Sequence, residues 1–190
     1  SMLSSMTTIS AIQTDYYAVL CADSQITEDN LISTSTSTPK IVEVGKFLIG
    51  ISGDIRPGDI LTYNWKPPIY RGENPVTYMG AKVIPSIITA FNDNNYEWNK
   101  VDKDGGFDYL FAFNGNIFRV ACDLSFFQTD HGTYGIGSGG QLALGYLYSI
   151  RKSDMELDYL KRHARRAVEI ASVLDSNTGK PIQLVVQERV

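Results

Sequence analysis

The segment Tyr17-Ala18-Val19-Leu20-Cys21-Ala22 is apolar at every position and rich in β-type residues. An apolar residue at every position, rather than at alternate positions, is typical of a strand that is covered on both faces. The β-rich residues 8–14 come before it and are joined to it at Thr14-Asp15-Tyr16, so the two segments predict a hairpin. The chain therefore has to place other layers above and below this strand.

Turn residues between β-rich runs predict further strands. Gly45 joins two of these runs as a hairpin, and Asn114-Gly115-Asn116 joins another pair. The Ser- and Thr-rich residues 24–38 are expected to form an ordered excursion with short strand character. The remaining expected strands are 40–44, 46–51, 107–113, 117–122, 126–128 and 182–187.

Two helices are expected in the middle of the chain. Ser52-Gly53-Asp54 is predicted to form a turn, and Asp54 to cap a short helix that extends to about Trp65. Apolar residues at helical spacing predict a second helix over about 79–92. Pro85 lies inside that pattern and should kink the helix or delay its start.

Two more helices are expected in the last third of the chain. One follows Gly140 and extends to Ile150, and the other covers about 154–174. The longer helix has one apolar stripe. Its members are Leu157, Leu160, Ala164, Ala167, Ala171 and Leu174. With no internal repeat, the segregated runs of strands and helices predict a single α+β domain.

Composition excludes several classes of function. The 190 residues suffice for one domain with a substantial core, and 43% of them are apolar. The net charge of −4 argues against nucleic acid as a partner, and a helix face explains the basic residues of 161–166. No apolar run has the length of a membrane span. We expect neither a nucleic acid nor a membrane as a partner.

Cysteine and histidine usage gives no sign of a metal or cofactor site. Cys21 and Cys122 lie in apolar, strand-like runs and are interpreted as buried thiols in a reducing cytosol. His131 and His163 are far apart in the sequence, and no Gly-rich phosphate motif is present. Residues 1–6 lack the basic and apolar regions of a secretion signal. We therefore expect a cytoplasmic protein without a metal or a cofactor.

Four groups of residues with chemical potential occur in a suggestive order. Thr7 begins the first strand, Asp23 ends the second and Lys40 begins the third, and Gly50-Ile51-Ser52-Gly53-Asp54 turns from a strand into a helix. Each has an ordinary explanation, as a turn aspartate, a solvated lysine at a sheet edge, or glycines that permit close packing. Taken together, their order and spacing resemble those of a proteasome β-type subunit, within the N-terminal nucleophile hydrolases.

Two later segments extend the resemblance over nearly the whole domain. Gly137-Ser138-Gly139-Gly140 resembles the glycine–serine segment near the nucleophile of that family. Asp175-Ser176-Asn177-Thr178-Gly179 resembles the family's late Asp-Ser-x-Ser-Gly segment, with Thr178 in place of the second serine. Alternatively, Ser138 is a helix cap, and Asp175 and Thr178 are ordinary turn residues.

The resemblance implies a fold and an assembly. The fold is a four-layer αββα sandwich, with two antiparallel sheets between helix layers, and the subunits form homo-oligomeric rings. Residues 7–190 then form one domain, and residues 1–6 are a leader that includes Ser1 as a cloning residue. An ATP-dependent unfoldase is an implied partner, with peptides or unfolded proteins as substrates.

The resemblance also implies a role for each site residue. Thr7 is the nucleophile, Lys40 the catalytic lysine, and Gly50 the source of the oxyanion-hole amide. Asp23 keeps Lys40 charged and in place. The remaining residues orient and support the nucleophile and its base; they are Ser138, Asp175 and Thr178.

The chemistry of Thr7 depends on a free amino group. A threonine hydroxyl is a poor nucleophile until a base takes its proton. An α-amino group has a reference pKa of about 7.7–8.0, which suits a general base, whereas a lysine at about 10.4 is better suited to supply fixed positive charge. We therefore assign the base to the Thr7 amine, acting directly or through a water.

Met6 departs from the family pattern, in which glycine precedes the nucleophile of self-processing subunits. If translation starts at Met6, a methionine aminopeptidase can remove it because Thr7 is small; the bacterial two-ring relative of the proteasome matures in this way. If translation starts at Met2, Leu3 is too large for such trimming, and the leader stays unless another activity removes it.

Three functions remain open at this point. The first is a threonine endopeptidase, active only after the residues before Thr7 are removed. The second is a non-catalytic ring-forming scaffold that keeps the fold with its leader in place. The third is an amidase for small molecules, with specificity set near Leu48 and Ser52.

Overall fold

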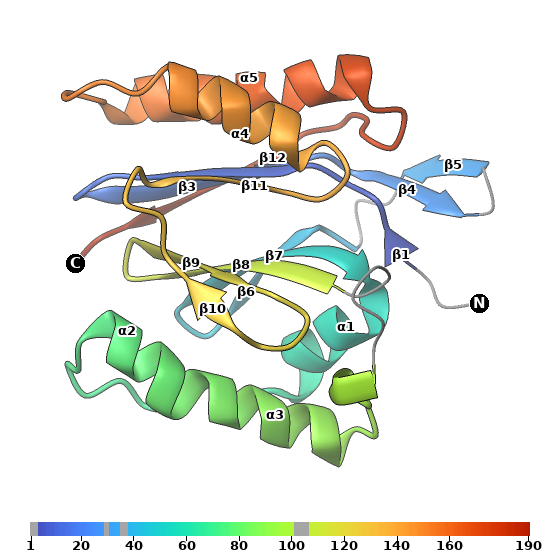
Figure 1. The fold of residues 1–190 in the computed structure, drawn as a ribbon, viewed down its shortest axis with the longest axis vertical. Coiled ribbons are helices and arrows are strands. Elements are labelled where there is room, and N and C mark those ends of the chain that lie inside the picture. The colour runs from blue at the N-terminus through green and yellow to red at the C-terminus, as the bar shows by residue number, and fades with distance from the viewer. Residues whose placement is uncertain (1–3, 29–30, 35–37, 101–106) are drawn as a thin grey trace.

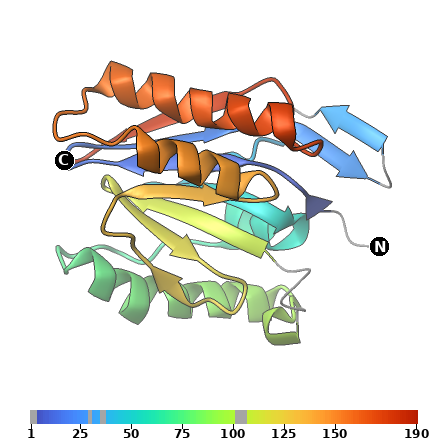
Figure 2. The same ribbon diagram turned by 45° about the horizontal axis from the view of Figure 1, so that its top comes forward.

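The computed structural model describes residues 4–28, 31–34, 38–100 and 107–190. Two antiparallel sheets lie face to face, and helices cover the outer face of each (Figure 1). This arrangement confirms the expected α+β fold, a four-layer αββα sandwich. Figure 2 shows the same layers from a second direction.

The first sheet carries the N-terminal hairpin at its centre. Its strand order is β11-β2-β3-β12, formed by Thr133–Ile136, Ile9–Gln13, Tyr17–Ala22 and Gln183–Glu188. Helices α4 (Gly140–Ser149) and α5 (Leu157–Leu174) cover its outer face (Figure 1). In β3, Leu20 packs between the two sheets, whereas Val19 packs against α5. The alternation explains why β3 is apolar throughout.

The second sheet holds the aromatic core. Its order is β1-β7-β8-β9-β10, with β6 also paired to β7. The strands are Ser4–Ser5, Ile41–Val44 (β6), Phe47–Asp54, Phe107–Phe113, Asn116–Val120 and Phe126–Phe127. Asn114 and Gly115, both at positive φ, make the tight turn that joins β8 to β9.

The outer face of the second sheet is covered by three helices, α1 (Ile55–Asn64), α2 (Pro75–Tyr78) and α3 (Ile84–Asp93) (Figure 1). Phe47 is buried there against Trp65, Tyr78 and Phe111. A separate ribbon of β4 (Gln25–Glu28) and β5 (Leu31–Thr34) projects beside the sheets (Figure 2). The ribbon confirms the short strand character expected within residues 24–38; residues 29–30 and 35–37 lie outside the described parts.

The prediction of a turn at Ser52-Gly53-Asp54 is wrong. Strand β7 continues to Asp54, because Ser52 is in register with Asp108 of β8 and Gly53 with Ser5 of β1. Asp54 stands at the start of α1, but its side chain makes no capping hydrogen bond.

The helix expected over 79–92 begins earlier, at Pro75. The side chain of Asn74 caps it by accepting hydrogen bonds from the amides of Val76 and Thr77. A π-helical turn at Met79–Val83 (η1) precedes α3, which contains Pro85. Such a turn accommodates the missing proline amide within a continuous helical path.

Three features in the last third of the chain also differ from expectation. Strand β11 was not predicted, because the glycine-rich segment around it suggested a helix start. Helix α5 begins at Leu157 rather than Asp154, and Leu174 is exposed although it was assigned to the apolar stripe. The other expected strands are present, with ends shifted by a few residues.

Gly135 in β11 should not tolerate a side chain. A Cβ at Gly135 would lie 2.1 Å from the backbone oxygen of Gly140. Gly135→Ala is therefore expected to lower the free energy of unfolding by about 1–3 kcal/mol or more. Gly145→Ala, in α4 with nothing within 4 Å of the added Cβ, should raise it by about 0.5–1 kcal/mol. Urea unfolding of both variants measures the difference, and equal stabilities would contradict the packing of β11 against α4.

Candidate active site

Three side chains meet where the ends of β2, β3 and β6 come together. Thr7 precedes β2, Asp23 follows β3 and Lys40 precedes β6, and all three are buried. The Lys40 ammonium lies 2.7 Å from Thr7 Oγ1 and 2.9 Å from Asp23 Oδ1. The Thr7 hydroxyl donates to the same carboxylate oxygen. The structure thus brings together three residues that the sequence singled out.

Backbone amides fix the carboxylate of Asp23. The amide of Thr8 lies 3.1 Å from Oδ1, and those of Gln25 and Gly179 lie 3.2 and 2.9 Å from Oδ2. Hydrogen bonds to a charged acceptor are among the stronger ones in proteins. Asp23 therefore has little freedom to turn away from Lys40.

Burial lowers the pKa of Lys40, and the negative charge of Asp23 opposes this effect. Lys40 also donates a hydrogen bond to the backbone oxygen of Gln25. Its three acceptors, on Thr7, Asp23 and Gln25, satisfy the three protons of an ammonium group. Lys40 is thus placed as a fixed positive charge against the Thr7 hydroxyl.

A second hydroxyl–carboxylate cluster adjoins the backbone of Thr7. Asp175 Oδ2 accepts hydrogen bonds from Ser138 Oγ at 2.6 Å and from Thr178 Oγ1 at 2.7 Å. Burial disfavours the charged form of Asp175, but these two donors and Asn177 outweigh it, so its pKa lies below the ordinary value.

This cluster touches the chain at Thr7 and Thr8. The hydroxyls of Thr178 and Thr8 are 2.7 Å apart, and Ser138 Oγ lies 3.3 Å from the backbone oxygen of Thr7. Glycines allow the approach, since a Cβ at Gly137, which has a φ of +89°, would lie 2.0 Å from that oxygen. Ser138, Asp175 and Thr178 therefore lie where supporting residues were expected.

The expected oxyanion residue, Gly50, does not face the cluster. The amide of Ile51 donates to Lys40 O on the β6 side of β7, and successive amides of an antiparallel strand alternate between its two neighbours. The Gly50 amide therefore faces β8, where Gly50 is in register with Leu110. The structure therefore does not bring the Gly50 amide to the cluster, and the position of Gly50 allows close packing against Ile9.

Thr7 is joined to Met6 by a peptide bond, so its nitrogen is an amide in this structure. Met6 is about half-exposed, and the two residues of β1 before it pair with Gly53 and Asp54 of β7. Ser4 and Ser5 thus lie in the sheet as a short additional strand next to the site.

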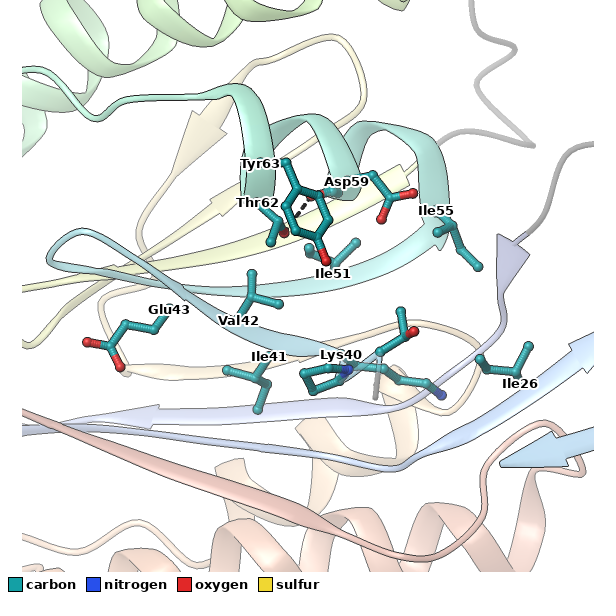
Figure 3. Close-up of a pocket in the computed structure, with 13 residues that line it drawn as sticks. Ile26, Lys40, Ile41, Val42, Glu43, Ile51, Ile55, Asp59, Thr62 and Tyr63 are labelled. Carbon is teal, nitrogen blue, oxygen red and sulfur yellow. Dashed lines mark hydrogen bonds between the residues drawn. The ribbon is translucent and has the colours of Figure 1, made fainter. Parts of the chain in front are cut away.

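A cavity of about 320 Å³ opens beside Lys40 (Figure 3). Helix α1 forms one wall through Ile55 and Tyr63, and β6 forms the opposite wall through Val42. Neither Leu48 nor Ser52, the expected specificity residues, belongs to its lining; Leu48 packs between the two sheets.

Two contributors to the site escaped the sequence analysis as functional residues. Gln25 supplies a backbone oxygen to Lys40, and its side chain donates to Ser176 O at 2.8 Å. Gly179 supplies an amide to Asp23, and a Cβ on it would lie 2.2 Å from Gln25 Oε1. The glycine at the end of 175–179 was a sequence signal for a close backbone contact. The backbone oxygen of Gln25 had no such signal, because every residue carries a backbone oxygen.

Solved structures with the same fold cover nearly the whole chain. BPH from Thiobacillus denitrificans is 22% identical, with a TM-score of 0.75, and the match covers 96% of this chain and 98% of that chain. For eukaryotic HslV from Trypanosoma brucei the identity is 16% and the TM-score 0.68, with 96% and 99% covered. Anbu from Yersinia bercovieri, described as an ancestral beta-subunit, is 12% identical, with a TM-score of 0.70. That match covers 95% of this chain and 81% of the Anbu chain.

These likenesses show that the chain shares the fold of BPH, HslV and Anbu, as the resemblance in sequence led us to expect. The sequence matches no protein-family model and no curated protein. Among the described residues, no cluster of His, Cys, Asp and Glu could hold a metal ion. None of the helices in those parts of the chain is long and apolar enough to cross a membrane.

The Lys40–Asp23 pair predicts a coupled effect on stability. Asp23→Asn should lower the free energy of unfolding by about 3–5 kcal/mol, because it leaves the Lys40 ammonium buried without its counter-charge. Adding Lys40→Met to that variant should recover part of the loss, since no buried charge is then unpaired. Urea unfolding of the wild type, both single variants and the double variant measures the coupling. Losses that simply add would show that the two residues do not act as a pair.

Proposed function

We propose that the protein is a threonine-type peptidase that becomes active when the residues before Thr7 are removed. The observation that carries the proposal is the contact of 2.7 Å between the Lys40 ammonium and Thr7 Oγ1, at a point where Thr7 begins the first core strand. Residues 1–6 are then a leader, and residues 7–190 are the catalytic domain.

In the proposed reaction, Thr7 Oγ1 attacks the carbonyl carbon of a peptide bond and its proton passes to the α-amine of Thr7. A free α-amine has a reference pKa of about 7.7–8.0, close to the pH at which it must act as a base. The amine then protonates the leaving amino group. Water hydrolyses the acyl ester, and the hydroxyl of Thr7 is regenerated.

Each neighbouring group has a defined part in this reaction. The positive charge of Lys40 favours the alkoxide character of Thr7 Oγ1, and Asp23 fixes Lys40. Ser138 contacts the backbone oxygen of Thr7, and Asp175 accepts a hydrogen bond from Ser138. These two residues would orient the amine and a water, and Thr178 would support them.

We place the oxyanion amide at Gly53 rather than Gly50. The Gly53 amide points to the same edge of β7 as that of Ile51, and beyond the end of β6 this edge is paired with β1. Removal of the leader would free that amide for a substrate. A peptide could then pair with the edge of β7 as an added strand, as β1 does in the uncleaved chain.

The proposal extends to assembly and partners. The fold shared with BPH, HslV and Anbu supports a homo-oligomeric ring with the sites inside. Peptides or unfolded proteins would be the substrates, an ATP-dependent unfoldase could deliver them, and the cytoplasm is the proposed location.

One observation favours a second candidate, a non-catalytic ring-forming scaffold. The leader pairs with β7, and Met6 keeps the Thr7 nitrogen in an amide that cannot act as a base. In a protein that never loses its leader, the buried cluster would serve stability alone. The identity of the first residue of the purified protein separates the two candidates.

The direct test compares two forms of the protein, one that starts at Thr7 and one that keeps residues 1–6. The Thr7 form should cleave fluorogenic peptides, because only it has a free α-amine, and the longer form should show little or no turnover. Intact mass before and after incubation establishes which first residue each form carries.

Substitutions in the Thr7 form identify the groups responsible. Thr7→Ala and Lys40→Met should each lower kcat/KM at least about 1,000-fold, through loss of the nucleophile and of its charge partner. Lys46→Met, at an exposed lysine in the β6–β7 turn, is the matched control and should keep full activity. If the Thr7 form assembles but has no turnover, the peptidase proposal fails and the scaffold remains.

A further inference from the structure

The cavity beside Lys40 is placed to receive one side chain of a substrate. Lys40 lines the cavity and contacts Thr7 Oγ1 at 2.7 Å. An extended peptide on the edge of β7 would therefore direct into it the side chain next to the attacked carbonyl. This reasoning rests on the proposed function, because it assumes that Thr7 Oγ1 attacks a peptide carbonyl.

The inner part of the cavity is suited to an aliphatic stem. Ile26, Val42 and Ile51 line it with apolar side chains, and Ile55 of α1 faces them (Figure 3). At about 320 Å³ the cavity is at the lower end of the range for small-molecule sites, enough for one long side chain.

The cavity lining has one carboxylate on α1, that of Asp59, whereas the carboxylate of Glu43 on β6 points away from α1 (Figure 3). Asp59 and Glu43 belong to its lining, and neither forms an ion pair with any residue that the structure describes. The one cation of the lining, Lys40, is neutralised by Asp23 at 2.9 Å. Asp59 is half-buried, so solvent screens its charge less than that of the exposed Glu43.

Tyr63 adds an aromatic face one helical turn from Asp59. Ile55, Asp59 and Tyr63 are spaced four residues apart in α1, which places them on the same side of the helix. The Tyr63 ring extends from α1 toward β6, and the side chain is 79% exposed (Figure 3). An aromatic ring beside a carboxylate favours a planar cation, which can stack on the ring and bind the carboxylate.

We propose that this cavity selects peptides with arginine, and after it lysine, on the acyl side of the cleaved bond. The aliphatic stem would lie along Ile51 and Val42, and the cationic group would reach Asp59 and Tyr63. An aspartate or glutamate there would meet like charge, and a leucine would leave Asp59 without a counter-charge.

The test uses the Thr7 form and fluorogenic peptides that differ only at that residue, which is Arg, Lys, Leu or Glu. We expect kcat/KM to fall in this order. Asp59→Asn should lower the ratio of the Arg to the Leu value about tenfold, and Tyr63→Leu should lower it less. Asp93→Asn, at an exposed position at the end of α3, is the control and should leave the ratio unchanged. A preference for Leu or Glu, or a ratio unaffected by Asp59→Asn, would overturn the proposal.

A binding measurement separates this inference from the proposed function. Fluorescence anisotropy of labelled Arg and Leu peptides with the Thr7→Ala form requires no catalysis. Tighter binding of the Arg peptide, lost in Thr7→Ala/Asp59→Asn, would support the cavity assignment even if no peptide were cleaved. Equal binding of the two peptides would refute it, whether or not the Thr7 form is a peptidase.

Discussion

The contact of Lys40 with Thr7 and Asp23 is the interaction on which the rest of the site depends. It joins the ends of three strands from two different sheets, so it forms only when the sheets pack face to face. A buried ammonium is costly without a counter-charge, and Asp23 provides one that three backbone amides hold in place. The four-layer fold therefore sets the charge and position of Lys40 against the hydroxyl.

The edge of β7 next to Thr7 is occupied by residues that precede Thr7 in the chain. Ser4 and Ser5 of β1 pair there with Asp54 and Gly53, and the Thr7 nitrogen is an amide. We propose that loss of the leader makes two changes at once, since it creates the base and frees the edge strand for a peptide. The acidic cavity beside Lys40 then adds selection for a cationic side chain.

Much of the fold could be predicted from the sequence, because β3 is apolar throughout and the Asn114-Gly115 turn is a strong hairpin signal. Thr7, Asp23 and Lys40 could be singled out because their order and spacing at strand termini resemble those of a proteasome β-type subunit. Strand β11 could not, since its neighbouring glycines serve close packing against α4 and carry no strand pattern.

The direction of the Gly50 amide could not be predicted either, because it depends on strand pairing, which residue order does not reveal. The measurement that most directly tests the central claim is the site of acylation. The Thr7 form, treated with an activated peptide ester and then digested, should carry the acyl group on Thr7 by mass spectrometry. Lys40→Met and the form that keeps residues 1–6 should carry little or none. Acylation elsewhere, or equal acylation of all three proteins, would contradict the account.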